Sequence, residues 1–219
     1  MATLNLPFFT TISDRFRVVL ASGSPRRREL LDRLNLRYEV IPSDFAEDLD
    51  KSQFASAGDY VLENAIIKAQ DVYQRVKGQS DKPLLIIGAD TVVVNSAGTI
   101  LEKPASEQDA ICTLKGLSGK ANTVFTGVCL IVGSSDGTKD PVVERAVEAT
   151  QVVFGDLDDS IIEAYVATGE PMDKAGSYAY QSLACFFVKE IKGDYYNVVG
   201  FPCARFYQML LDLHHRGHF

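Results

Sequence analysis

Two short apolar runs, each followed by small and polar residues, most constrain how this chain can fold. Residues 17–21 (RVVLA) and 84–87 (LLII) are too short for helices and rich in aliphatic side chains, which is typical of buried strands. The first run leads into Ser22-Gly23-Ser24-Pro25 and the second into Gly88-Ala89-Asp90-Thr91. Because ligands collect at strand ends in α/β proteins, both segments are candidate parts of a site.

Helices and further strands are interleaved with these two runs. Helical spacing of apolar residues predicts helices that begin at Pro25 and near Val61, and others at 107–117, 158–168 and 204–213. Strand patterns cover 37–42, 92–94 with 100–101, 123–132 with 142–154, and 185–191 with 195–199, the last pair as a hairpin about Lys192-Gly193-Asp194. The combination predicts an α/β fold with a mixed β-sheet flanked by helices, as two lobes of one domain or as two domains.

The N-terminal segment differs from the rest of the chain. Residues 1–16 contain apolar side chains without a sustained period, which predicts a loosely packed N-terminal extension before a folded domain at 17–219. No stretch reaches the roughly 18 to 20 apolar residues that span a bilayer, and the first charge, Asp14, is acidic. We therefore expect a soluble, cytoplasmic protein with no membrane partner, and leave a weak organelle-targeting role open.

Charge and residue usage exclude several function classes. The net charge of -7 argues against a nucleic-acid-binding surface, so a polyanionic ligand must meet a local basic cluster. All three histidines lie in the last six residues, which disfavours Ser-His-Asp, Cys-His and His-zinc chemistry unless the tail folds back. The four cysteines are far apart, and we expect buried free thiols.

The segment after residue 21 is the first candidate site. A strand that ends in small residues and opens a helix offers free N–H groups and the positive end of a helix dipole to a phosphate. Arg26 and Arg27 in the first helical turn are unusual, because cations are disfavoured there unless an anion also binds. Solvated arginines after a Ser-Pro helix start would give the same pattern.

Asp90 is the second candidate. A carboxylate at the end of a buried strand is costly unless it is paired or metal-bound, so Asp90 could hold Mg²⁺ or orient a water, or could only cap the next turn. Two further groups are open to functional or purely structural interpretations: the single lysines Lys68, Lys103, Lys120 and Lys174, and the aromatic and amide residues Tyr178, Tyr180, Gln181, Tyr195, Tyr196 and Asn197.

In order along the chain, these segments resemble the Maf family of nucleoside triphosphate pyrophosphatases, which is similar to the inosine triphosphatase group. The matching residues cover about 18–213 and are Leu20-Ala21-Ser22-Gly23-Ser24-Pro25-Arg26-Arg27, Glu63-Asn64-Ala65 with Lys68-Ala69, Gly88-Ala89-Asp90-Thr91-Val92, Leu101-Glu102-Lys103-Pro104, Ser118-Gly119-Lys120 to Thr126-Gly127, Gly169-Glu170-Pro171-Met172-Asp173-Lys174-Ala175-Gly176-Ser177-Tyr178 with Gln181, and Asn197-Val198-Val199-Gly200-Phe201-Pro202.

The resemblance implies a fold and an activity. It implies an elongated mixed sheet with two lobes around a cleft, and a hydrolase that converts a nucleoside triphosphate to the monophosphate and pyrophosphate. Lys174 and Gln181 resemble the branch that acts on dTTP and UTP, where removal of modified nucleotides would be the purpose. A non-catalytic nucleotide-binding regulator of cell division, and a pyrophosphatase specific for 7-methyl-GTP, are the alternatives. A homodimer is left open.

The resemblance also assigns residues. Asp90 would be the proton acceptor, and Arg26, Thr91 and Gln181 would set specificity. The other substrate contacts would be Ser22, Arg27, Lys68 and Lys103, and a Mg²⁺ or Mn²⁺ ion would be bound through Glu47 and Asp90. Two residues depart from the family pattern: Asn122 stands where the family often has His, and Ser182 stands where it usually has Gly after the Gln.

Overall fold

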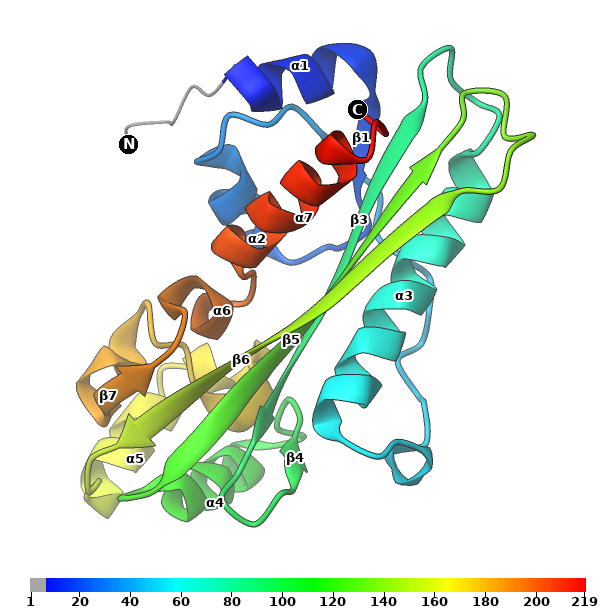
Figure 1. The fold of residues 1–219 in the computed structure, drawn as a ribbon. Coiled ribbons are helices and arrows are strands. Elements are labelled where there is room, and N and C mark those ends of the chain that lie inside the picture. Colours follow the sequence, from blue (N-terminus) through cyan, green and yellow to red (C-terminus); the bar gives the residue numbers. More distant parts are fainter. Residues whose placement is uncertain (1–6) are drawn as a thin grey trace. The chain divides into compact units, whose positions relative to one another are not determined.

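The computed structural model describes residues 7–219, and the chain forms two compact units (Figure 1). Unit 1 comprises the described residues up to Asp90 together with 127–147 and 203–219, and unit 2 comprises 91–126 and 148–202. The α-helices are α1 (Pro7–Arg15), α2 (Pro25–Asp32), α3 (Ala57–Val76), α4 (Glu107–Leu117), α5 (Asp159–Val166), α6 (Tyr195–Val199) and α7 (Cys203–His215). The strands are β1 (Arg17–Leu20), β2 (Glu39–Val40), β3 (Leu84–Val94), β4 (Ile100–Leu101), β5 (Ala121–Gly133), β6 (Val142–Phe154) and β7 (Val188–Lys192).

The strands of the described residues form one mixed sheet, which confirms the predicted fold class. Their order is β2-β1-β3-β5-β6-β7, and β4 pairs with β3. β1 is parallel to both β2 and β3, whereas β3 with β4 and β6 with β7 are antiparallel. The parallel pair β1 and β3 is built from the buried apolar residues 18–20 and 84–87, as expected for strands that are covered on both faces.

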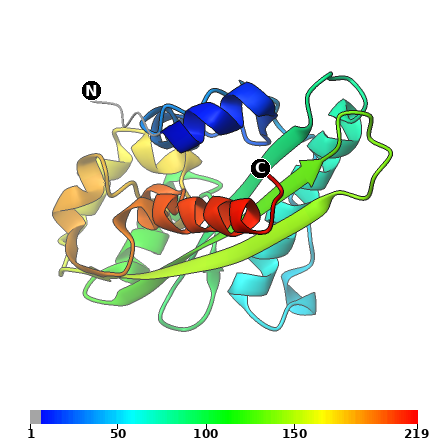
Figure 2. The ribbon, with the colours of Figure 1, turned by 45° about the horizontal axis from the view of Figure 1, so that its top comes forward.

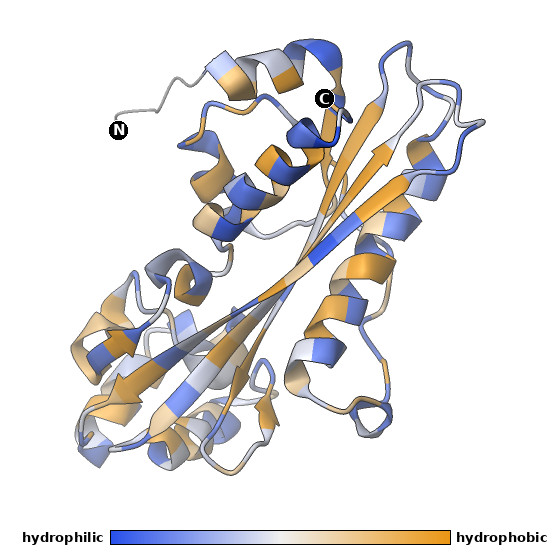
Figure 3. Cartoon of the chain, viewed as in Figure 1, coloured by the Kyte–Doolittle hydropathy of each residue, from blue (hydrophilic) through white to orange (hydrophobic). Residues whose placement is uncertain are grey.

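The core of unit 1 lies between α3 and the strands. Apolar residues of α3, including Ala65, Ala69 and Val72, are fully buried against β1, β3 and β5. Figures 1 and 2 show α3 on one face of these strands and α7 on the other. Figure 3 shows the matching apolar colouring along the strands between the two helices. The apolar residues that recur at helical spacing from Val61 onward therefore form the face of α3 that builds this core.

The core of unit 2 is built around Phe154 and two helices. Phe154 packs edge-on against Tyr178 with ring centroids 4.9 Å apart, and Tyr165 packs in the same way against Phe187 at 4.9 Å. Buried residues of α4 and α5 complete this cluster. Ser106 caps the N-terminus of α4, because its Oγ accepts the N–H of Asp109 at 3.2 Å.

Two local predictions are wrong. The Gly88-Ala89-Asp90-Thr91 segment does not end the strand, since β3 runs unbroken from Leu84 to Val94 and its last residues pair with β4 in the predicted hairpin. The expected strand at 195–199 is the helix α6 instead, so no hairpin forms with β7. The side chain of Asp194 accepts the N–H of Tyr196 at 2.8 Å, and this N-cap starts a helix where an apolar pattern suggested a strand.

Residues 7–16 also differ from the loosely packed segment expected there, whereas 1–6 lie outside the described residues. α1 buries Phe9 and Ile12, and Ser13 Oγ accepts the N–H of Arg37 at 3.0 Å. The Phe9 ring lies 5.9 Å from the ring of Tyr207 in α7. The burial comes from α7, far along the chain, and a local pattern does not reveal it. Within 7–219, no helix is both long enough and apolar enough to cross a membrane.

Candidate functional site

Three charged side chains, two of them buried, form the centre of the candidate site in unit 1. Lys68 Nζ, on α3, donates to Asp90 Oδ1 at 2.8 Å and lies 2.9 Å from Glu47 Oε1. The side chains of Lys68 and Asp90 are only 8% and 9% exposed, whereas that of Glu47 is 47% exposed. The ammonium supplies the countercharge that a buried carboxylate needs. Three residues predicted separately, Glu47, Lys68 and Asp90, are thus brought together.

Two glycines let α3 lie directly on the strands beside this group. A Cβ at Gly88 of β3 would stand 2.4 Å from Ala65 O, and one at Gly127 of β5 would stand 2.6 Å from Val61 O. Side chains alternate along a strand, so Asp90 points to the same face of β3 as Gly88, toward α3. The Gly-x-Asp spacing therefore brings the carboxylate to Lys68.

Glu47 is held in an uncommon backbone conformation. Its φ of 57° lies in the left-handed region, which residues with a Cβ rarely adopt. Strained residues of this kind gather at functional sites, where surrounding contacts fix them. The ion pair with Lys68 is such a contact.

The turn between β1 and α2 confirms the predicted strand, turn and helix, and it orients one arginine. Ser22 Oγ accepts Arg27 Nη1 at 2.9 Å and the N–H of Ser24 at 3.3 Å. Ser24 occupies the N-cap position but makes no side-chain capping bond, with Pro25 following as predicted. Ser22 and Arg27 are buried, and Arg26 is half-buried.

Electrostatics connects Arg27 to the acidic residues of unit 1. Burial lowers the pKa of the Arg27 guanidinium, while the charges of Asp90 and Glu47 act in the opposite direction. The same two carboxylates that contact Lys68 therefore also stabilise the charge of Arg27. Unit 1 combines two buried cations with two carboxylates, a set suited to a small, highly charged ligand.

The predicted site residues of unit 2 have different surroundings. Thr91, directly after Asp90 on β3, shares a hydrogen bond with Thr126 of β5, with 3.0 Å between the Oγ1 atoms, and its hydroxyl lies 3.4 Å from Gly200 O. Lys103 and Gln181 are both exposed. Thr126 is an additional polar residue to which the sequence pattern assigned no role, although it lies in one of the matching segments.

The two departures from the family pattern both make hydrogen bonds in unit 2. Asn122 Oδ1 accepts the Tyr178 hydroxyl at 2.9 Å. Ser182 Oγ donates to Glu170 Oε2 at 2.5 Å, and the Tyr165 hydroxyl donates to Glu170 Oε1 at 2.9 Å. Tyr165 Oη also accepts the N–H of Ala179 at 3.2 Å. Gln181 is therefore flanked by two anchored residues, Ala179 through Tyr165 and Ser182 through Glu170.

The other candidates predicted from the sequence make contacts within the protein that are typical of structural residues. Lys174 pairs with the neighbouring Asp173, and Lys120 donates to the carbonyl of Gly116. Asn197 is fully buried and donates to Val124 O and Thr150 Oγ1, both at 3.0 Å. Tyr178 and Asn197 are therefore core residues, which agrees with the structural alternative left open for them.

No cysteine or histidine belongs to the charged group of Glu47, Lys68 and Asp90. All four cysteines are free, but only Cys129 is fully buried, and burial raises the pKa of its thiol to about 12. Cys112 and Cys185 are exposed, so the expected burial is wrong for both. The ring of His214 packs edge-on against Phe8 of α1, with centroids 5.5 Å apart.

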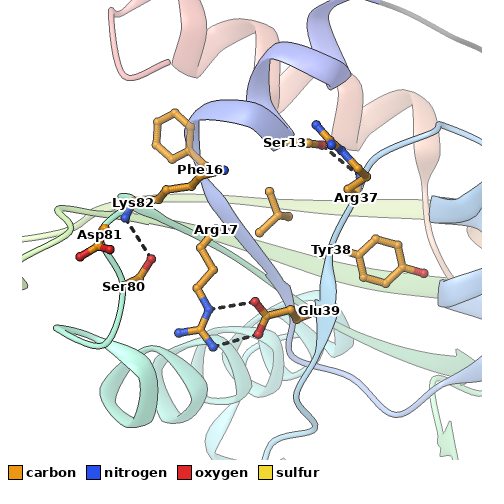
Figure 4. Close-up of a pocket in the computed structure, with 10 residues that line it drawn as sticks. Ser13, Phe16, Arg17, Arg37, Tyr38, Glu39, Ser80, Asp81 and Lys82 are labelled. Carbon is orange, nitrogen blue, oxygen red and sulfur yellow. Dashed lines mark hydrogen bonds and ion pairs between the residues drawn. The ribbon is translucent and has the colours of Figure 1, made fainter.

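A pocket of about 490 Å³ lies elsewhere in unit 1, where β1 begins (Figure 4). Arg17 Nε and Nη2 donate to the two carboxylate oxygens of Glu39 at 3.1 and 2.8 Å. Arg37, which also lines it, pairs with Asp14. Since these two arginines already have carboxylate partners, the pocket is less suited to an anion than the turn at Ser22, beyond the other end of β1.

Asn64 is a further buried polar residue to which the sequence pattern assigned no role. It belongs to a matching segment and is fully buried one helical turn before Lys68. Its position in the sequence could have indicated a role, because Asn64 places a carboxamide among the apolar residues of α3 that face the strands.

The sequence is similar to that of known proteins. A family model described as "Maf-like protein" matches residues 17–213. A "dTTP/UTP pyrophosphatase" of Thermococcus kodakarensis is 45% identical over 185 residues, covering 84% of this chain and 90% of that protein. One from Alkaliphilus metalliredigens is 42% identical over 195 residues, covering 89% and 94%.

The chain is also similar to part of a longer relative and to a solved structure. The "Probable bifunctional dTTP/UTP pyrophosphatase/methyltransferase protein" of Homo sapiens is 45% identical over 201 residues; the match covers 91% of this chain but only 32% of that protein. Among solved structures, a HAM1 protein from Coxiella burnetii is 16% identical, with a TM-score of 0.45, and the match covers 91% of this chain and 99% of that one.

Proposed function

Since the chain belongs to the Maf family, we propose that it is a nucleoside triphosphate pyrophosphatase that acts on dTTP and UTP. Water would attack the α-phosphorus, the bond from that phosphorus to the oxygen bridging it to the β-phosphorus would break, and the nucleoside monophosphate and pyrophosphate would leave. The relatives named dTTP/UTP pyrophosphatase support this substrate choice. Clearance of modified pyrimidine nucleotides in the cytoplasm would be the purpose.

The buried Lys68–Asp90 pair is the observation that carries the proposal. A carboxylate at 9% side-chain exposure next to a lysine is costly in a purely structural role, but it suits a base that must take a proton from water. Asp90 accepts that proton in the proposed reaction. Lys68 supplies the countercharge of this carboxylate and orients it through the 2.8 Å contact.

Cationic side chains bind the triphosphate. Hydrolysis of a phosphoanhydride needs charge neutralisation more than covalent chemistry from the protein. Arg26 and Arg27 at the start of α2 supply it, with Ser22 orienting Arg27. The family resemblance assigns a substrate contact to Lys103 as well, which is exposed in unit 2.

Glu47 and Asp90 fit a divalent cation. Both carboxylates reach one point, the Nζ of Lys68, at 2.9 and 2.8 Å, so the two can approach a common cation. Mg²⁺ and Mn²⁺ bind well through one or two carboxylates when phosphate oxygens and water complete the shell. Residues 7–219 contain no cluster of three or more His, Cys, Asp or Glu side chains arranged for a metal. When bound, the ion would polarise the α-phosphate.

Thr91 and Gln181 read the base in this proposal. A hydroxyl and a carboxamide can each hydrogen-bond the polar edge of a pyrimidine. Thr91 is oriented by Thr126, and Gln181 lies between two residues anchored through Tyr165 and Glu170.

One panel tests the function. Pyrophosphate release is measured with dTTP, UTP, CTP, GTP, ITP and 7-methyl-GTP, each with Mg²⁺ and with a chelator. We expect release from dTTP and UTP that depends on the metal. Binding without release from any nucleotide would instead identify a non-catalytic regulator, and preference for 7-methyl-GTP would assign another specificity.

A further inference from the structure

Asn64 is a polar side chain that the fold buries without compensating it. It is 0% exposed, and neither Oδ1 nor Nδ2 has a hydrogen-bond partner among residues 7–219. A buried carboxamide that makes no hydrogen bonds is rare, because its desolvation is not recovered. Asn64 also lies in the interior of α3, too far from either end to cap the helix. Asparagine is a weak helix former at such a position. The fold alone gives no reason for an amide here.

Its position points to the Lys68–Asp90 pair. Residues four apart share one face of a helix, so Asn64 lies directly before Lys68 on the buried face of α3. Gly127 and Gly88 bring the backbone of residues 61–65 onto β5 and β3, leaving little room between helix and strands. Asp90 points to this same face of β3. The amide is therefore confined to the layer that holds the candidate base.

The chemistry of the amide selects its ligand. A carboxamide offers N–H donors and a carbonyl acceptor, and both are unpartnered here. A phosphate oxygen could only accept, which would leave Oδ1 unsatisfied. A water molecule both donates and accepts, so it can satisfy both atoms.

We propose that Asn64 holds a water molecule against Asp90, and that this water is the nucleophile of the reaction. The inference rests on the proposed pyrophosphatase function and adds a residue to it. Asn64 orients the water and Asp90 takes its proton, so a loss of Asn64 slows the chemical step while nucleotide binding persists.

Two buried asparagines give a matched test. Asn64→Leu replaces the amide by an apolar side chain of similar size, and Asn64→Ala is the smaller alternative should leucine clash. Asn197→Leu is the control, because Asn197 is equally buried but its Nδ2 already has protein acceptors. Tm, kcat and KM with UTP are measured for each, and crystals of the wild-type protein are examined for an ordered water.

The expected result separates function from folding. Asn64→Leu should keep or raise Tm and lower kcat by about 10- to 100-fold with KM nearly unchanged. Asn197→Leu should lower Tm. The crystal should contain a water within about 3 Å of both Asn64 and Asp90. An Asn64→Leu protein that loses as much Tm as Asn197→Leu, or keeps the wild-type kcat, would overturn the proposal.

Two other outcomes are distinguishable. A raised KM with unchanged kcat would show that Asn64 contacts the nucleotide and not the water, which also overturns the inference. Wild-type protein that releases no pyrophosphate from any nucleotide would refute the proposed function, and with it the assignment of this water as a nucleophile. The crystal would then report separately whether Asn64 binds water.

Discussion

The candidate residues of unit 1 are centred on a buried ion pair, whereas those of unit 2 are held by neutral hydrogen bonds or are exposed. Lys68 and Asp90 form a pair at 2.8 Å with little solvent exposure. In unit 2, Thr91 is oriented by another threonine, and Gln181 extends from an anchored segment into solvent. Charges in a low-dielectric site interact strongly and over a distance, whereas neutral hydrogen bonds act only at contact.

This difference separates the tasks that each group can perform. Buried charge suits proton transfer and stabilisation of a polyanion, because both require strong electrostatics. Exposed neutral groups suit discrimination between bases, where a few hydrogen bonds decide between similar ligands. Variants in unit 1 should therefore change rate, phosphate binding or stability, and variants of the neutral residues Thr91 and Gln181 in unit 2 should change preference.

The largest effect is expected from Asp90→Asn. The amide cannot accept the proton from water, so kcat should fall by about 10²- to 10⁴-fold while nucleotide binding persists. Pyrophosphate release and calorimetric binding of UTP measure the two separately. Asp159→Asn, which changes an exposed carboxylate in α5, is the control and should keep the wild-type rate. A near-normal rate for Asp90→Asn would remove Asp90 from the role of base.

The next prediction tests whether burial makes the Lys68–Asp90 pair important for the free energy of unfolding. Lys68→Met leaves the Asp90 carboxylate buried without its cation, which should lower the free energy of unfolding by about 3 to 5 kcal/mol. Lys115→Met breaks an ion pair of the same 2.8 Å length with Asp159, but the latter is exposed, so little change is expected. Urea denaturation measures both. Equal losses of unfolding free energy in the two variants would show that burial does not distinguish the two ion pairs.

The residues of this pair also show what a sequence can predict. The periodicity of α3 and the apolar start of β3 depend on nearby residues, so both elements were predictable. The continuation of β3 through Asp90 was not, because Gly88-Ala89-Asp90-Thr91 has the composition of a turn. Lys68, 22 positions before Asp90, supplies the charge that lets the aspartate remain in a buried strand.

Long-range contacts explain the remaining differences. α1 is stabilised by aromatic contacts with α7 at the opposite end of the chain, which no window of sequence contains. The helix α6 depends on one N-cap, Asp194, in a segment whose apolar residues also suit a strand. In the site, the residue types and order indicated charge chemistry, but the sharing of Lys68 by Asp90 and Glu47 required the fold.

A moderate effect is expected from Arg26→Ala. Loss of a charge-assisted contact to phosphate should lower kcat/KM for UTP by about 10- to 100-fold, mainly through KM. Steady-state kinetics measure it. Arg28→Ala changes the exposed arginine two positions along α2 and should have little effect. Equal kinetics for the two variants would place Arg26 outside the phosphate site and reduce the unit 1 group to its buried members.

The smallest effect is expected from Gln181→Ala, and it tests the other side of the comparison. An exposed carboxamide that reads a base contributes to selection and not to the chemical step. The ratio of kcat/KM for UTP to that for GTP should therefore fall by about tenfold, while Tm stays near the wild-type value. Gln208→Ala, on the exposed face of α7, controls for the loss of a surface carboxamide. An unchanged ratio for Gln181→Ala would mean that base preference arises elsewhere. A large loss of kcat for every nucleotide would mean that unit 2 takes part in the chemistry, and the division between charge in one unit and recognition in the other would fail.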